Sequence, residues 1–150
     1  MGMNENFRNH GNEDVRPFLN ERQNEVYGLH MLGIDDQTLA DLLSIKLNTI
    51  HCHLGDIREL LNFESRLKMA VAHFKYFETK GDDSMYDRLS PAERKVFALL
   101  VEGYSQEETA LALHRAVGTI RATMRNIYAK FNCPSATRLV FKYYLGDNKI

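Results

Sequence analysis

Residues 89–131 read LSPAERKVFALLVEGYSQEETALALHRAVGTIRATMRNIYAKF, and they contain three helix patterns in succession. The first two begin with a capping box, in which a Ser is followed three residues later by a Glu, at Ser90–Glu93 and Ser105–Glu108. Gly103 marks the end of the first helix. The third helix, roughly 116–131, has apolar residues at alternating spacings of three and four, which is typical of one buried face: Val117, Ile120, Met124, Ile127 and Phe131.

A fourth helix is predicted from Ser135 onward, because this Ser is a suitable N-cap and apolar residues follow it at helical spacing. The same four-helix pattern occurs earlier in the chain. At an offset of 70, residues 19–74 and 89–144 align without gaps and are identical at 11 of 56 positions. The identical pairs include Leu19/Leu89, Gly33/Gly103, Thr49/Thr119 and Ser65/Ser135.

We therefore expect an all-α chain of two tandem four-helix units. Its expected parts are a polar N-terminal tail at 1–17, a first unit at 18–77, a polar linker at 78–88 and a second unit at 89–146. The composition, 44% hydrophobic and 26% charged, is typical of globular proteins. No apolar run approaches the roughly 20 residues of a membrane helix, so no membrane partner is expected. Two cysteines and a polar N-terminus indicate a reduced cytosolic compartment.

The net charge of −1 hides an uneven distribution of charge. Residues 19–74 carry five basic residues against eight acidic ones, whereas residues 89–144 carry eight against four. Arg121 and Arg125 lie four apart on the third helix of the second unit, so they share a face away from its apolar positions. With the small Ala122 beside them, this face suits a DNA major groove, where arginine can bond bidentately to guanine. A merely solvated basic face is the alternative.

Residues 89–144 resemble the LuxR/GerE-type helix-turn-helix domain of bacterial transcription regulators. The family motif residues extend over the whole segment: Leu89-Ser90, Glu93, Val96, Leu99, Gly103, Ser105, Glu108-Thr109-Ala110, Leu113, Thr119-Ile120-Arg121-Ala122-Thr123, Ile127 and Lys130-Phe131. The segment departs from the family pattern where Arg115 replaces an apolar residue and Ala116 replaces a Ser cap. The first unit resembles the same domain more distantly, through Leu19, Val26, Leu29, Gly33, Ala40, Leu43, Ile45, Thr49-Ile50, His53, Ile57 and Leu61.

This resemblance implies that the third helix of the second unit reads double-stranded DNA. It assigns base contacts to Arg121, Ala122 and Arg125, and phosphate contacts to Thr119, Lys130, Ser135 and Arg138. The first unit would offer only weak DNA contacts, at Lys46, Thr49, His51 and Cys52. The fourth helix, the usual dimer contact of the family, contributes Leu139, Val140, Tyr143 and Tyr144, and in the first unit Ala70, Val71 and Phe74. We expect a bacterial transcription regulator in the cytoplasm, associated with the nucleoid.

The role of the first unit stays open at this point. It could complete a pseudo-dimer within one chain, or it could serve homodimerisation or the binding of a partner regulator. The last possibility leads to a rival function, an antagonist that pairs with another helix-turn-helix regulator and keeps it off DNA. The acidic first unit and the low net charge are the reasons to consider it.

No enzymatic activity, cofactor or metal site is predicted. His51 and His53 point about 200° apart on a helix, so they cannot chelate one ion together. Cys133 is interpreted as an inert, half-buried thiol in a loop. The sequence contains neither a Gly-rich phosphate loop nor a spacing of Ser, His and Asp that suggests nucleophilic catalysis.

Overall fold

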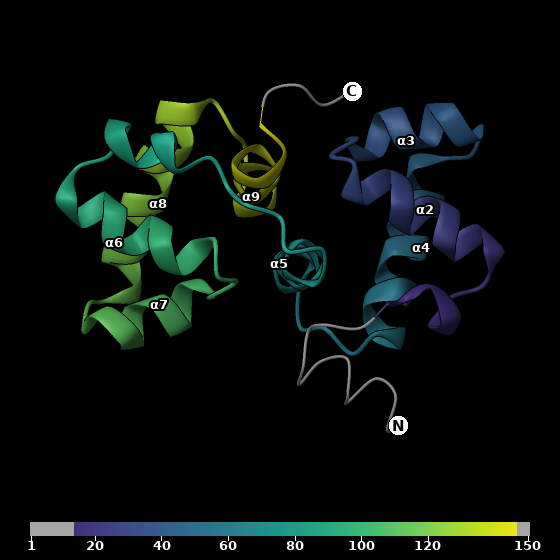
Figure 1. Ribbon diagram of the computed structural model, residues 1–150, viewed down its shortest axis with the longest axis horizontal. Coiled ribbons are helices and arrows are strands. Elements are labelled where there is room, and N and C mark those ends of the chain that lie inside the picture. Colours follow the sequence, from purple (N-terminus) through teal and green to yellow (C-terminus); the bar gives the residue numbers. More distant parts are fainter. Residues whose placement is uncertain (1–13, 147–150) are drawn as a thin grey trace. The chain divides into compact units, whose positions relative to one another are not determined.

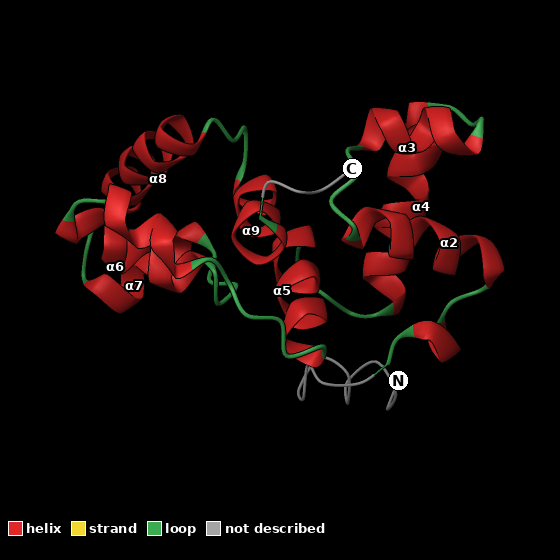
Figure 2. Cartoon of the chain, turned by 45° about the horizontal axis from the view of Figure 1, so that its top comes forward, coloured by secondary structure: helices red, strands yellow, loops and turns green. Residues whose placement is uncertain are grey.

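The computed structural model describes residues 14–146 of the chain, and these residues form helices joined by short loops, with no strand among them (Figures 1 and 2). The expectation of an all-α fold is confirmed for this part of the chain. The α-helices of the first half are α2 (Glu21–Met31), α3 (Asp36–Leu43), α4 (Leu47–Leu60) and α5 (Arg66–Tyr76). Those of the second half are α6 (Pro91–Leu100), α7 (Gln106–Leu113), α8 (Val117–Phe131) and α9 (Ala136–Leu145). Short 3-10 helices precede each set, η1 (Arg16–Phe18) and η2 (Asp83–Arg88).

The chain divides into two compact units, with the boundary between Thr79 and Lys80. This boundary lies inside the segment expected to be a linker, 78–88, but most of that segment packs on the second unit. Met85 is buried, and the Asp82 amide donates to the Tyr143 carbonyl oxygen at 2.8 Å. A Cβ on Gly81 would overlap the Tyr143 ring, so only glycine fits there. The polar sequence gave little sign of this packing, because its partners lie about sixty residues further along the chain.

Most of the polar tail expected at 1–17 lies outside the described residues, which begin at Asp14. The last part of that segment is folded. Val15 is buried, and η1 begins at Arg16, where Pro17 supplies the fixed backbone angle that suits a first helical turn.

Both predicted capping boxes of the second unit are present. The Ser90 hydroxyl accepts from the Glu93 amide at 3.3 Å, and the Glu93 carboxylate accepts from the Ser90 amide at 2.9 Å. Ser105 and Glu108 make the same pair of bonds at 3.1 and 2.8 Å. These bonds satisfy backbone donors that a helix start would otherwise leave unpaired, so they fix where α6 and α7 begin.

The core of the second unit forms where α8 packs against α6 and α7. The apolar positions predicted for the third helix are mostly buried, with Ile120, Met124, Ile127 and Phe131 each no more than 4% exposed. They meet a similar apolar face of α6, formed by Val96, Phe97 and Leu100. This packing leaves the opposite face of α8 to solvent.

The two units have the same order of elements at a constant offset. The helices α2, α3, α4 and α5 begin at residues 21, 36, 47 and 66, and α6, α7, α8 and α9 begin at residues 91, 106, 117 and 136. The positive-φ residues follow the same offset of 70, as the pairs Gly33/Gly103, Ser44/His114 and Asn62/Asn132. Equal offsets at helix starts and at left-handed turns make a residue-by-residue comparison of the two units possible.

Candidate nucleic-acid interface

A tight turn joins α7 to α8. His114 ends α7 in the left-handed conformation (φ 56°), and the Arg115 amide donates to the Ala110 carbonyl oxygen at 3.0 Å. Ala110 is buried, and its small side chain allows α7 and α8 to pack closely. Two short helices joined by a three-residue turn form the helix-turn-helix arrangement, in which the second helix is the one that can enter a groove.

The exposed face of α8 carries the three predicted base contacts. Arg121, Ala122 and Arg125 are exposed, whereas Ile120 and Met124 on the opposite face are buried. Within its bounds, α8 contains three basic residues and no acidic one. The helical period therefore presents positive charge and a small side chain on the surface that a DNA groove would contact.

The two arginines differ in their surroundings. Arg121 Nε donates to Gln106 Oε1 at 3.1 Å, which holds its guanidinium beside the first turn of α7. Arg125 makes no hydrogen bond or ion pair with any residue between 14 and 146. Arg125 is therefore free to adapt to a ligand, while Arg121 is oriented by Gln106 through its Nε and keeps its terminal N–H groups for DNA.

Three of the predicted phosphate contacts lie at or near helix starts. Thr119 is exposed in the first turn of α8. Ser135 is the N-cap of α9, and its hydroxyl accepts from the Arg138 amide at 3.3 Å. The Arg138 guanidinium lies 5.4 Å from the centre of the Phe141 ring. Helix starts expose backbone N–H groups, which suits anionic oxygens, so these positions are compatible with phosphate.

Sequence reasoning missed a further cation near this surface. Lys95 of α6 lines a hollow of about 220 Å³ together with Arg115, Thr119 and Thr123. Both Lys95 and Arg115 are exposed. Lys95 could have been found from the sequence only by knowing that α6 passes beside the start of α8.

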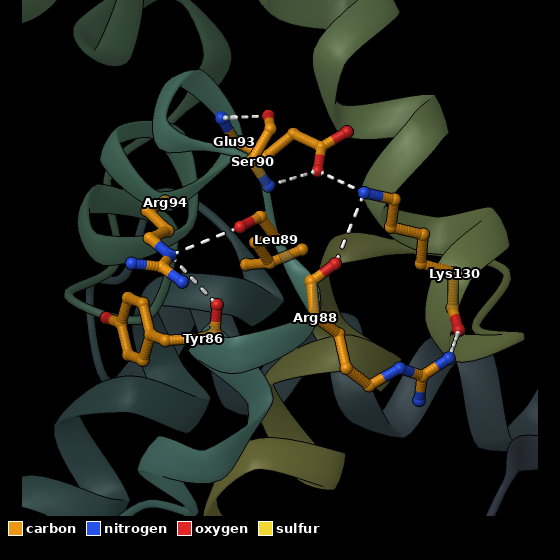
Figure 3. A network of polar contacts seen from close by, with 7 residues as sticks. All are labelled: Tyr86, Arg88, Leu89, Ser90, Glu93, Arg94 and Lys130. Atoms are coloured by element: carbon orange, nitrogen blue, oxygen red, sulfur yellow. Dashed lines mark hydrogen bonds and ion pairs between the residues drawn. The ribbon is translucent and has the colours of Figure 1, made fainter.

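Lys130, the fourth predicted phosphate contact, is engaged within the second unit (Figure 3). Its Nζ lies 2.6 Å from Glu93 Oε1 and donates to the Arg88 carbonyl oxygen at 3.2 Å, while the Arg88 guanidinium donates to the Lys130 carbonyl oxygen. The hydrogen bond from Lys130 holds the pKa of the Glu93 carboxyl below its usual value. Lys130 thus ties the end of α8 to α6 and η2, and its contact with phosphate stays a prediction.

The residues predicted for the dimer contact lie on the fourth helices of their units. In α9, Leu139 and Val140 are buried, and both tyrosine hydroxyls have partners within the second unit. Tyr143 donates to Asp83 Oδ1 at 2.6 Å, and Tyr144 donates to the Val101 carbonyl oxygen at 2.9 Å. Burial raises the pKa of Tyr144 to about 12, so it stays a donor at neutral pH. The counterparts Ala70, Val71 and Phe74 are on α5, and the pairing of these helices stays a prediction.

The corresponding surface of the first unit has different chemistry. His51 takes the position of Arg121, and its Nε2 lies 3.2 Å from Asp36 Oδ2, which also binds Arg66 at 3.0 Å. The other three weak-contact candidates also lie on or beside α4, with Lys46 as its N-cap and Thr49 and Cys52 in its first turns. Cys52 is an exposed free thiol. Because Asp36 places a carboxylate beside His51 and Arg66, this surface is less attractive to phosphate than that of the second unit.

Two further properties of the described residues bear on the candidate ligands. Between residues 14 and 146, no three or more His, Cys, Asp and Glu side chains are grouped so that they could hold a metal ion. In the same part of the chain, no helix combines the length and the apolarity that crossing a membrane requires.

Comparison with known proteins places the helix-turn-helix in a family. Residues 87–142 match GerE, the bacterial regulatory proteins of the luxR family. The chain is also 27% identical over 117 residues to the response regulator protein VraR of Staphylococcus saprophyticus, a match that covers 78% of this chain. The chain spans about half the length of that relative, 53%. No solved structure matches the chain significantly. At residues 87–142, the chain therefore carries a helix-turn-helix domain of the LuxR/GerE type.

Proposed function

We propose that this protein is a bacterial DNA-binding regulator of transcription, and that α8 reads its operator in the major groove. The observation that carries the proposal is the division of α8 into two faces. One face is buried against α6 and α7, and the other presents Arg121, Ala122 and Arg125 to solvent within the segment that matches the LuxR family. The similarity to a response regulator supports the same function.

In the proposed mechanism, Arg121 and Arg125 each donate to the O6 and N7 atoms of a guanine. A bidentate pair of this kind contributes roughly 1 to 3 kcal/mol of discrimination against a wrong base. Ala122, between them in sequence, lets the helix backbone approach the base edges and offers a methyl contact to thymine. The bond from Arg121 to Gln106 fixes the direction of the guanidinium before DNA arrives, which reduces the entropy lost on binding.

Phosphate contacts would position α8 in the groove. We assign this role to Thr119, Ser135 and Arg138, and add Lys95 and Arg115 because they line the hollow beside Thr119. Each neutralised phosphate releases counterions, so the slope of log affinity against log salt should be about −0.9 for each contact. Lys130 can join this set only if it shares its ammonium group between Glu93 and DNA.

For the first unit, we propose a second helix-turn-helix unit that does not read bases. The pairing of His51 with Asp36 and the presence of Asp56 and Glu59 on α4 support this view. We further propose that the fourth helices mediate pairing, either of the two units as a pseudo-dimer or of two chains. In a pair of two chains, the two α8 helices would lie about one DNA turn apart, whereas a pseudo-dimer within one chain would read bases at one half-site alone.

The charge of the first unit favours a second candidate function for the chain, which is antagonism of another regulator. The first unit, with eight acidic against five basic residues between 19 and 74, would suit a basic partner, such as the reading helix of another regulator, better than it suits DNA. The two functions give different results for the substitutions Arg121→Ala and Arg125→Ala. DNA reading is lost in the double variant, whereas binding to a partner regulator through the first unit is kept.

The test is selection from a randomised duplex pool, followed by fluorescence anisotropy at about 50 and about 200 mM salt. We expect wild type to enrich one motif, to weaken steeply with salt, and to lose the motif in Arg121→Ala/Arg125→Ala. The matched control is Arg22→Ala/Lys80→Ala, which removes two exposed charges that do not lie on α8. If wild type enriches no motif even at low salt, reading by α8 is refuted, and antagonism of a partner regulator becomes the favoured function.

A further inference from the structure

The first unit contains a cavity of about 240 Å³ between η1, α2 and α5. Its walls are largely apolar and include Val15, Tyr27, Gly28, His73, Tyr76 and Phe77. An engineered apolar cavity of about 150 Å³ is known to stay dry and to bind benzene, so the space here is enough for a ring with further atoms. All of the lining residues belong to the first unit.

The equivalent place in the second unit is filled by a tyrosine ring. The Tyr86 ring of η2 packs edge-on against Phe97 with 5.0 Å between ring centroids, and against Tyr143 with 6.4 Å. Phe97 and Tyr143 contact each other at 5.5 Å. Three aromatic rings, one each from η2, α6 and α9, therefore close the space between these elements.

The first unit keeps two of these rings and lacks the third. At the offset of 70, Phe97 and Tyr143 correspond to Tyr27 and His73, whose ring centroids are also 5.5 Å apart. Tyr86 corresponds to Arg16, and the Arg16 side chain turns away to an ion pair with Asp14, with its Nε 2.9 Å from Asp14 Oδ1. The Arg16 side chain is 76% exposed, so no side chain of η1 fills the space that the Tyr86 ring fills in the second unit.

The backbone frame around the missing ring is conserved between the units. In the second unit, Arg94 Nε donates to the carbonyl oxygens of Tyr86 and Leu89 at 3.0 and 3.1 Å (Figure 3). In the first unit, Asn24 Nδ2 donates to the equivalent oxygens of Arg16 and Leu19, both at 3.1 Å. The empty space is thus not caused by a displaced η1.

Asn24 also leaves an acceptor unused beside this space. Asn24 lines the cavity, and its Oδ1 is buried without a hydrogen-bond partner among residues 14–146. A buried acceptor without a donor is costly, and it gains free energy when a ligand supplies an N–H or O–H group. Arg94, the equivalent residue of the second unit, has no such acceptor.

The cavity is also suited to an uncharged ligand. Burial lowers the pKa of His73 to about 4, so its ring is neutral at physiological pH. Burial likewise raises the pKa of Tyr27, whose hydroxyl oxygen lies 3.2 Å from His73 Nδ1. The Asp14–Arg16 pair, the only charged groups among the lining residues, has no net charge.

We propose that the cavity of the first unit is a binding site for a small, neutral aromatic molecule that carries an N–H or O–H donor, of the indole or phenol class. The ligand ring takes the place that the Tyr86 ring fills in the second unit, and its donor bonds to Asn24 Oδ1. This site is independent of the function proposed for α8, because it uses no residue of the second unit.

The test uses the full chain and indole as the probe. Because the chain has no tryptophan, the fluorescence of indole can be followed without a protein background from that residue. We expect saturable binding with a blue shift of the indole emission. 1-Methylindole, which lacks the N–H donor, should bind about tenfold more weakly, the loss expected for one hydrogen bond.

The decisive variant is Arg16→Tyr, which supplies the missing ring from η1. We expect it to weaken indole binding at least about tenfold and to raise the thermal midpoint of the first unit, because the added ring fills the cavity. Arg22→Tyr on α2 is the matched control, since Arg22 does not line the cavity, and it should bind indole like wild type. If Arg16→Tyr does not fold, Gly28→Met replaces it, because a Cβ at Gly28 meets no atom within 4 Å.

Three results would overturn the proposal. Indole that shows no saturation up to its solubility limit means that the cavity does not accept the ring. Unchanged indole affinity in a folded Arg16→Tyr or Gly28→Met variant means that indole binds elsewhere. Equal affinities for indole and 1-methylindole exclude the hydrogen bond to Asn24. None of these results depends on whether the chain binds DNA, so failure here is distinct from failure of the proposed function.

Discussion

The substitution Lys130→Met removes the ammonium group that joins the end of α8 to α6 and η2, while it keeps most of the apolar stem. In wild type, Lys130 Nζ lies 2.6 Å from Glu93 Oε1 and 3.2 Å from the Arg88 carbonyl oxygen. Glu93 is only 8% exposed, so its carboxylate would lose a strong donor that water cannot fully replace. A hydrogen bond to a charged group contributes about 1.5 to 3 kcal/mol. Because the Lys130 side chain is 39% exposed, we expect a loss of about 1 to 2 kcal/mol in unfolding free energy.

The loss of unfolding free energy in Lys130→Met should depend on pH, because protonation of the Glu93 carboxylate removes the ion pair in wild type as well. The pKa of Glu93 is held below the usual 4.5, first by the hydrogen bond from Lys130 and then by the Ser90 amide. The unfolded chain binds the proton at higher pH, so the pair stabilises the fold above about pH 4.5. This stabilisation is lost as the pH falls through the lowered pKa. The difference between wild type and Lys130→Met should therefore be constant near neutral pH and shrink below about pH 4.5.

The assay is urea unfolding followed by far-ultraviolet circular dichroism, with hydrogen exchange of the α6 and α8 amides to assign the transition. Glu93→Gln and the double variant complete a cycle, and we expect a coupling energy of about 1 kcal/mol between the two residues. The slope of DNA affinity against salt should be unchanged in Lys130→Met. Unaltered stability together with a slope smaller by about 0.9 would refute the structural role and assign Lys130 to a phosphate.

Three further outcomes are expected from the structure. Ile127→Ala in the core of the second unit should cost about 2 to 5 kcal/mol in urea unfolding, because the side chain is fully buried; a cost below about 1 kcal/mol would contradict the packing. Ser105→Ala should cost about 1 kcal/mol through the lost cap of α7, and Ser105→Asp, which can cap, should recover most of it. An NMR titration of His73 should give a pKa near 4. Because the unfolded chain protonates near pH 6.5, stability of the first unit should fall by up to about 3 kcal/mol between about pH 6.5 and 4; a pKa near 6.5 with no such loss would contradict the burial.

The helices and the candidate DNA-binding face could be predicted from the sequence because their signals are local. A capping box needs only residues three apart, and Ser90–Glu93 and Ser105–Glu108 form as predicted. The two faces of α8 follow from the period of 3.6 residues, which puts Ile120 inside and Arg121 outside. The constant offset between the units was likewise visible in the sequence alone.

The ion pair and the cavity required the tertiary structure. Lys130 and Glu93 are 37 residues apart, and no sequence period relates them; they meet because α8 packs on α6. Lys95 joins Arg115 and Thr119 for the same reason. The folded segment from Gly81 to Arg88 has a polar sequence, and its contact with Tyr143 becomes apparent only when α9 is in place.

The sequence by itself determined that this chain is helical, where most of its helices begin, and which face of α8 is free. The sequence also has Arg16 at the position that corresponds to Tyr86 in the second unit, but only the structure shows that this difference leaves a cavity. In the second unit the Tyr86 ring fills a space between three elements, and in the first unit the Arg16 side chain turns to solvent. Local hydrogen bonds and helical periodicity act between neighbours in the chain, whereas the shape of a cavity depends on side chains that only packing brings together.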